Sequence, residues 1–238
     1  MTTFTIDFNF NPADQNAILT QLQAQGYNLL GYKGATGPNQ ITAGVPTWFS
    51  LPFTGLFGAV DIDYTPLYQV YVFNKANIAA NTVISMSAQS NPMPLGSALT
   101  FNQNGNFVSG GVTNVPAASL GLMNNSLNTV TVGLAGLVNL PNGTSQYQPF
   151  CAFSLNPANS IIMTPLETIL LVASQSNLAS GNVQAAVSAP GCTFTFNNNT
   201  IEYDLQMMAN SFAITNIPGS APVLPVSSGS TIGTIVNI

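Results

Sequence analysis

TFTIDFNF, residues 3–10, alternates apolar and polar side chains at every position. The apolar members of this stretch are Phe4, Ile6, Phe8 and Phe10. A β-strand turns successive side chains to opposite faces, so this period of two predicts a strand with one buried, aromatic-rich face. This stretch is the clearest indication of β-structure in the chain.

The segment that follows, residues 11–26, has the signals of a helix. Asn11 is expected to cap its first turn, Pro12 suits the first helical position and Asp14 favours the positive end of the helix dipole. Gly26 suits the C-terminal stop. An apolar stripe is supplied by Ile18, Leu19 and Leu22. We expect this to be the only substantial helix.

After residue 26 the sequence consists of short runs rich in Val, Ile, Thr and Phe, separated by Gly, Pro and Asn. Each run is predicted to be a strand, including residues 60–75, 82–88 and the C-terminal STIGTIVNI. Asn104-Gly105 predicts a type I′ hairpin, and Asn142-Gly143 predicts a second turn. The expected fold is all-β: a sandwich or jelly roll of about a dozen short antiparallel strands with one short N-terminal helix.

We expect one compact β domain over residues 1–238. A weak internal similarity leaves open two related halves, 1–112 and 113–238. In that alternative, residues 68–77 correspond to 147–159, 87–91 to 173–177 and 100–105 to 195–200. The three matches run in the same order, as a duplication with insertions would require.

Charge is scarce in this chain. Charged residues make up 4% of it, against roughly a quarter in typical soluble proteins, and there is no Arg or His. Asn alone occurs 28 times, which predicts an exterior of amides and hydroxyls. Without His, catalytic triads and ordinary zinc sites are excluded. Two Lys and a net charge of −5 exclude nucleic acid as a partner.

Two pairs of acidic residues are candidate metal ligands. Asp61 and Asp63 would share one face of a strand, and Glu202 and Asp204 would share one face of another. If the pairs meet, they supply the oxygen ligands that Ca²⁺ prefers. The alternative is two solvated strand faces. A carboxylate-based glycosidase is disfavoured, because the chain has no Arg or His to orient a substrate and only one Trp.

Two further features each have two interpretations. Cys151 and Cys192 both lie in strand-like runs, so they are either a disulfide or two small buried thiols. The aromatic residues of 47–57 are either an exposed binding patch or core, and we favour core. Those aromatic residues are Trp48, Phe49, Phe53 and Phe57.

These observations favour a non-enzymatic structural protein that self-assembles into an oligomer, fibre or crystalline lattice. Neutral polar surfaces repel identical copies little and can pair without stripping water from ions. Its partner would be another copy of itself. One alternative is a secreted toxin or pore-forming protein that inserts residues 128–147 into a membrane. Another is a carbohydrate-binding, lectin-like module that uses the acidic pairs to hold calcium.

The sequence leaves the compartment open. Its first residues, MTTFTIDFNFN, lack the basic start and unbroken apolar core of a signal peptide. The low charge and the absence of His favour an extracellular protein or one stored as an inclusion.

Overall fold

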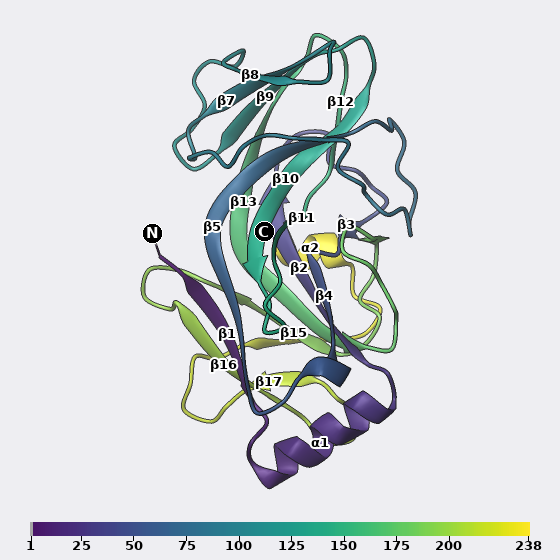
Figure 1. Cartoon of the computed structure of the whole chain (residues 1–238), viewed down its shortest axis with the longest axis vertical. Coiled ribbons are helices and arrows are strands. Elements are labelled where there is room, and N and C mark those ends of the chain that lie inside the picture. The colour runs from purple at the N-terminus through teal and green to yellow at the C-terminus, as the bar shows by residue number, and fades with distance from the viewer. Residues whose placement is uncertain (1) are drawn as a thin grey trace.

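The computed structural model describes residues 2–238 and has two eight-stranded sheets. In the first sheet the strand order is β11-β10-β5-β1-β16-β17, with β12 on β10 and β6 on β5. Its strands are β1 (Phe4–Asn9), β5 (Ala59–Phe73), β6 (Ala88–Gln89), β10 (Val130–Asn139), β11 (Ser145–Pro149), β12 (Phe153–Leu155), β16 (Glu202–Met207) and β17 (Ile214–Asn216). The all-β expectation is therefore confirmed, and Phe4–Asn9 of the stretch 3–10 form β1, a central strand of this sheet (Figure 1).

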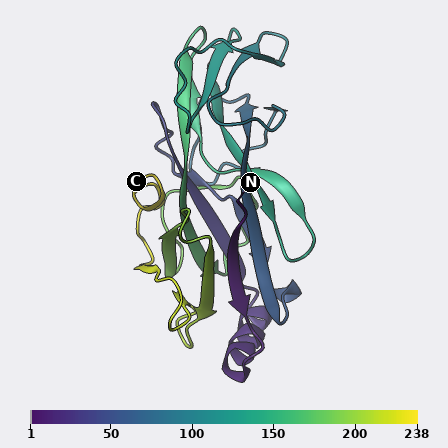
Figure 2. The ribbon, with the colours of Figure 1, turned by 90° about the vertical axis from the view of Figure 1, so that its left-hand side faces the viewer.

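The second sheet has the order β18-β15-β13-β9-β7-β8, with β2 on β13 and β4 on β2. Its strands are β2 (Asn28–Thr36), β4 (Phe49–Pro52), β7 (Ala98–Asn102), β8 (Phe107–Ser109), β9 (Leu120–Asn125), β13 (Ser160–Ser174), β15 (Gly191–Thr195) and β18 (Leu224–Val226). A small third sheet pairs β3 (Val45–Pro46) with β14 (Val183–Gln184). Figure 2 shows the two large sheets as separate layers of an elongated molecule.

Two details differ from the expectation of short antiparallel strands. The β1–β16 and β7–β9 pairings are parallel. In addition, β5 and β13 each contain 15 residues and run through most of the length of the molecule (Figure 1). Both long strands contain a proline, Pro66 and Pro165, and β13 is bulged against β2 just after its proline. Proline removes a ladder donor, so pairing is interrupted there without ending the strand.

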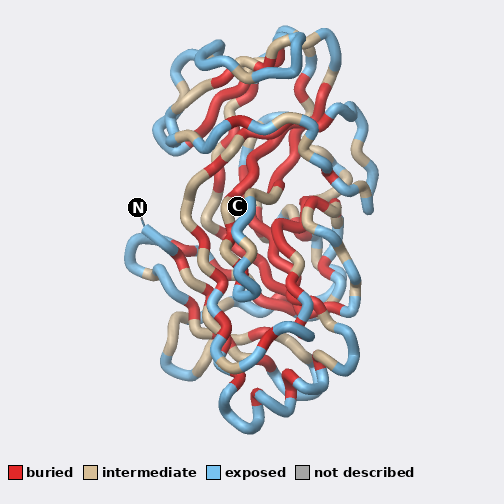
Figure 3. Tube along the Cα trace, viewed as in Figure 1, coloured by how far each residue is buried: buried red, intermediate tan, exposed pale blue. Residues whose placement is uncertain are grey.

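One large hydrophobic core fills the space between the sheets. It contains inward-facing residues of both layers, among them Phe8 and Val70 from the first sheet and Leu122 and Leu171 from the second. Figure 3 shows the buried segments along the middle of the molecule and the exposed ones in loops. Within residues 47–57, Trp48, Phe49 and Phe53 are in this core, as expected, whereas Phe57 is 73% exposed.

The N-terminal helix, α1 (Ala13–Ala24), is confirmed, but its start differs from the expectation. Pro12 is the N-cap residue, and no side chain caps the first turn, so the predicted role of Asn11 is wrong. The end follows the Schellman pattern. Gly26 has φ +67°, its N–H is donated to the Gln23 carbonyl, and the Tyr27 N–H is donated to the Leu22 carbonyl.

The C-terminal residues are helical rather than extended. Residues Ile232–Val236 form α2, where a strand was expected from their β-branched composition. Ile232 and Val236 are four residues apart and both fully buried, packed with Leu30 and Tyr32 of β2. Residues four apart in sequence are neighbours on one face of a helix, so both can cover the same patch of β2. In a strand they would lie too far apart to do so. Tertiary packing therefore overrides local propensity.

The hairpin at Asn104-Gly105 is confirmed, but its turn type is not. Gly105 has φ +79°, while Asn104 is not among the residues of positive φ, so the type I′ expectation is wrong. Strands β7 and β8 are joined through a wider loop, in which the Asn102 side chain accepts the backbone N–H groups of Asn104 and Asn106. The Asn142-Gly143 turn has the same backbone hydrogen bonds, with Gly143 at φ +80°, but here the Asn142 side chain accepts the Thr144 N–H.

Some strands were missed and others were overestimated. Strand β9 and the first half of β13 were not predicted, and residues 82–88 form mainly irregular structure where a strand was expected. A short 3₁₀ helix, η1 (Phe53–Gly55), follows β4. No helix among residues 2–238 has the length and apolar character needed to cross a membrane.

Each sheet combines strands from residues 1–112 with strands from residues 113–238. For example, β5 pairs with β10 and β2 pairs with β13. Residues 68–73 lie in β5, whereas 147–159 span β11, a connection and β12. The hypothesis of two related halves stays a prediction.

Candidate functional site

Five of the seven acidic residues lie on one outward face of the first sheet. Strand β1 lies between β5 and β16, and its Asp7 is opposite Asp61 on one side and Asp204 on the other. Residues opposite each other in a sheet point to the same face. The two acidic pairs predicted from the sequence are therefore on a common face, with one strand between them.

The next row across these strands is Asp63, Thr5 and Glu202. The Thr5 hydroxyl donates a 2.8 Å hydrogen bond to the Asp63 carboxylate. We call this set of five carboxylates the acidic patch. It consists of Asp7, Asp61, Asp63, Glu202 and Asp204.

Three members of the acidic patch are close enough to share a cation. Carboxylate oxygens of Asp7, Glu202 and Asp204 all lie within 4.8 Å of one another. Glu202 and Asp204 were predicted as ligands, but Asp61 and Asp63 are not part of this closest group. Asp7 was missed, although it occupies a polar position of the alternating stretch 3–10 and therefore had to face outward with its neighbours.

The surroundings of Asp7 disfavour its negative charge. Partial burial, followed by repulsion from Asp61, Asp204 and Glu202, raises the pKa of the Asp7 carboxyl above its usual value of 3.8. Its Oδ1 atom is buried and has no hydrogen-bond partner among the described residues. A divalent cation or a proton would relieve this repulsion, because either one reduces the local negative charge.

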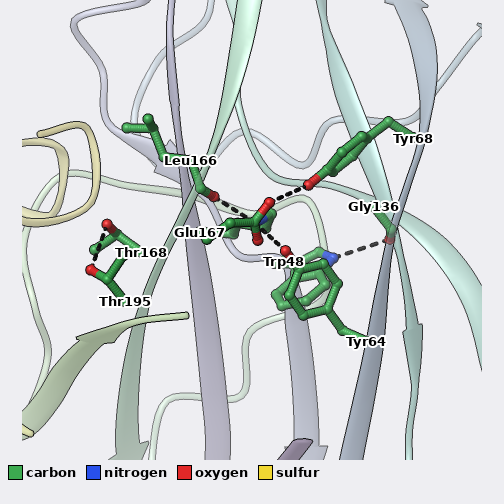
Figure 4. Close-up of polar contacts among 9 residues, drawn as sticks. Trp48, Tyr64, Tyr68, Gly136, Leu166, Glu167, Thr168 and Thr195 are labelled. Carbon is green, nitrogen blue, oxygen red and sulfur yellow. Dashed lines mark hydrogen bonds and ion pairs between the residues drawn. The ribbon is translucent and has the colours of Figure 1, made fainter. Parts of the chain in front are cut away.

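A second polar cluster lies inside the sandwich, around one of the two lysines. Lys33, on β2, is completely buried. Its Nζ donates to the Tyr64 hydroxyl at 2.8 Å, to the Leu166 carbonyl at 2.5 Å and to the Glu167 carboxylate at 2.7 Å. The Tyr68 hydroxyl donates to the other carboxylate oxygen of Glu167 at 2.8 Å. Figure 4 shows Glu167 of β13 reaching toward Tyr68 of β5.

The cluster also occupies an irregularity in the second sheet. Pairing between β13 and β2 shifts between Pro165 and Ile169, so Leu166 and Glu167 lie in a bulge. The partly buried Leu166 carbonyl accepts from Lys33, so this backbone group of the bulge has a hydrogen-bond partner. Aromatic rings enclose the ammonium, with Nζ 4.5 Å from the Tyr64 ring centroid and 5.7 Å from that of Phe150.

The geometry of this cluster is that of a structural link rather than a catalytic group. An ammonium has three protons to donate, and Lys33 has three acceptors for them. Nothing is left to contact a substrate. The link joins β2 and β13 of one sheet to Tyr64 and Tyr68 of the other, and so connects the two layers (Figure 4).

Cys151 and Cys192 are both buried, and both are free thiols in the structure. Cys151 lies between β11 and β12, where its sulfur accepts the Leu134 N–H at 3.2 Å, and Cys192 lies on β15 of the other sheet. Burial raises the pKa of Cys151 to about 12 and also raises that of Cys192. Each therefore stays protonated at neutral pH and is a poor nucleophile.

The segment suspected of membrane insertion, residues 128–147, contains β10 and the start of β11. Strand β10 pairs with β5, β11 and β12, and most of its residues are buried. Insertion of this segment would require these pairings to break. The pore-forming alternative stays a prediction.

No known protein family, curated protein or solved structure matches this chain.

Proposed function

We propose that this chain is a structural protein that self-assembles with copies of itself into an oligomer, fibre or lattice. The observation that supports the proposal most is the absence of charge from the four strands that end the two sheet orders. The strands at the ends of the two sheet orders are β11 and β17 in the first sheet and β18 and β8 in the second. Their sequences are SQYQP, ITN, LPV and FVS.

Open edges normally need protection. An edge strand presents unpaired N–H and C=O groups, and soluble proteins commonly block pairing there with charged residues, lysine above all. None of these four strands contains a charged residue. Of the two lysines, Lys33 is buried within the sandwich, so it does not protect an edge. Prolines in β11 and β18 limit pairing at two positions only.

The distribution of charge supports the same proposal. Five of the seven acids are in the acidic patch, which leaves Asp14, Glu167 and Lys75 as the other charged side chains that solvent reaches. Most of the remaining exterior is amide and hydroxyl, so copies that approach through it desolvate few ions. Repulsion between copies would be confined to one face.

The test is the state of association of the purified protein, measured by sedimentation velocity and negative-stain microscopy over a series of concentrations. We expect association that grows with concentration. The double variant Q146K/Q148K adds two charges to β11, the longest of the four edge strands, and should weaken association if that edge is used.

The matched control is A17K/A24K, which adds the same charge to exposed positions of α1. This control should associate like the unmodified protein. A chain that remains monomeric at every concentration would show that the proposal is wrong. Lysine pairs placed in the same way on β8, β17 and β18 identify the edge concerned.

Calcium binding by the acidic patch is a second proposal, supported by the three carboxylates within 4.8 Å of one another. Titration calorimetry with CaCl₂ on chelator-treated protein tests it. We expect saturable binding that is lost in D204N and retained in D14N, since Asp14 lies outside the patch. Absence of heat with the unmodified protein, or equal binding by D204N, would contradict it.

A further inference from the structure

A large pocket lies beside β7 and β8, away from the acidic patch (Figure 1). It has a volume of about 840 Å³, within the range of ligand sites. Residues 90–99 form one side of it, and β8 with the loop that follows forms the other. Strands β7 and β8 are at one end of the molecule, while β1 and β16 lie toward the other (Figure 1).

The lining of this pocket is neutral throughout. It includes no Asp, Glu or Lys, and the chain has no Arg or His. An ion that entered would lose hydration without gaining a counter-charge, so charged ligands are disfavoured. Ligands for this pocket must therefore be recognised through neutral hydrogen bonds and apolar contact.

Neutral hydrogen-bonding groups are available on both sides. Asn91 and Ser97 line one side, and Ser109 and Asn114 line the other. Asn91, Ser109 and Asn114 are exposed and Ser97 is partly exposed, so these amides and hydroxyls, which both donate and accept, are open to solvent. Such solvent-facing groups can exchange water for ligand hydroxyls, which also donate and accept.

Apolar groups complete the pocket. Met93, Leu99 and Phe107 line it, and the Phe107 ring is held 5.4 Å from the ring of Phe101, centroid to centroid. An aromatic ring offers a flat apolar surface to the C–H groups of a sugar. Mixed lining of this kind suits a molecule with hydroxyls on its rim and C–H groups on its faces.

The first side of the pocket is anchored before any ligand binds. The Ser90 N–H is donated to the Val70 carbonyl at 2.9 Å, and the Met93 N–H to the Tyr68 carbonyl at 3.0 Å. The Ser90 hydroxyl also accepts the Val70 N–H at 3.0 Å. Both Tyr68 and Val70 belong to the long strand β5, so this side rests on the main sheet.

The second side is anchored to β7. The Gly110 N–H is donated to the Ala98 carbonyl at 2.9 Å, and the Thr100 hydroxyl donates to the Gly110 carbonyl at 3.1 Å. Gly111 has φ +95°, and a Cβ there would clash with the Thr100 hydroxyl. The loop can approach β7 this closely only because it is glycine. A site that is already formed loses less entropy on binding.

We propose that this pocket binds an uncharged, hydroxyl-rich ligand, namely a neutral saccharide. The site shares Phe107 and Ser109 of β8 with one of the four proposed assembly edges, and it does not overlap β11, β17 or β18. It is independent of the acidic patch, since no carboxylate lines it. Saccharide binding should therefore not require calcium.

The experiment is an array of neutral oligosaccharides with terminal glucose, galactose, mannose or N-acetylglucosamine, together with sialylated and sulfated ones, probed with and without EDTA. We expect retention on at least one neutral saccharide, no preference for the anionic ones and no effect of EDTA. Titration calorimetry with the retained saccharide then compares variants.

The double variant N91A/N114A removes one amide from each side and should weaken binding about tenfold or more. The control N77A/N104A changes two exposed amides outside the pocket and should bind normally. Because Asn114 has φ +57°, S97A provides a second variant that leaves the backbone of the loop unchanged. Three results would each overturn the proposal: no retained neutral saccharide, a preference for anionic glycans, or unchanged binding in both pocket variants.

Discussion

At the scale of single residues, the interior position of Lys33 is the most informative finding. A cation can be fully buried only when its charge and its donors are matched, and here Glu167, Tyr64 and the Leu166 carbonyl do so. Nothing in the local sequence GYKGAT indicates burial. The partners come from β5 and β13, far along the chain.

Replacing this lysine should destabilise the protein. In K33M the Glu167 carboxylate, 27% exposed, loses its only cation and keeps the Tyr68 hydroxyl, and the free energy of unfolding should fall by about 3 kcal/mol. The double variant K33M/E167Q should lose less, because no unpaired charge remains. Urea denaturation measures both. K75M, which changes an exposed lysine, is the control and should keep the midpoint of the unmodified protein.

Replacing Asp7 of the acidic patch should stabilise the protein, in contrast to replacing Lys33. Since the pKa of Asp7 is raised in the folded state, the ionised form opposes folding above that raised pKa. This opposition weakens as the pH falls through the raised value toward 3.8, where the unfolded chain also takes up the proton. In chelator, D7N should therefore melt at a higher temperature than the unmodified protein at neutral pH.

The gain should shrink as the pH approaches the ordinary aspartate value, and thermal melts at several pH values measure it. D14N is the control, because Asp14 lies in the first turn of α1, where a carboxylate is favourable. It should show no gain. A lower melting temperature for D7N at neutral pH would contradict the assigned repulsion.

At the scale of elements, the left-handed conformation of Gly26 ends α1. Gly26 is left-handed, and a Cβ placed on it would meet no atom within 4 Å. The G26A variant therefore tests conformation alone, and it should lose about 1 kcal/mol of stability in urea denaturation. Gly55, which has equally open surroundings and no positive φ, supplies the comparison. G55A should change stability by less than about 0.5 kcal/mol.

The elements also show where local reasoning fails. Period-two alternation located β1 correctly, and helix signals located α1. The segment 232–236 became a helix because Ile232 and Val236 together cover one patch of the second sheet, which their β-branched composition does not reveal. Strand β9, with the sequence LGLMNN, was missed because it lacks both alternation and β-branched residues, and it is defined instead by pairing with β7 and β13.

At the scale of the whole molecule, the four strands that end the two sheet orders carry no charge, and the proposed self-association uses these strands. If association uses the neutral edges, salt should have little effect, because screening acts on charges. Raising NaCl from about 50 mM to about 500 mM should change the association constant by less than about twofold. Sedimentation equilibrium measures this. Association that strengthens steeply with salt would instead indicate that repulsion between acidic patches controls the contact.

The sequence by itself determined the all-β class, the N-terminal helix and the scarcity of charge, because alternation, capping residues and composition are local properties. It also indicated the acidic pairs on β5 and β16. Only the tertiary structure placed Asp7 between them, since the β1–β5 and β1–β16 registers join three distant segments.

The same holds for the interior and the pocket. Contacts between residues far apart in the chain decide which lysine is buried and which strands are left as edges. They also decide which neutral side chains line the 840 Å³ pocket. Such contacts are decided by the packing of the two layers as a whole, and no short stretch of residues specifies them.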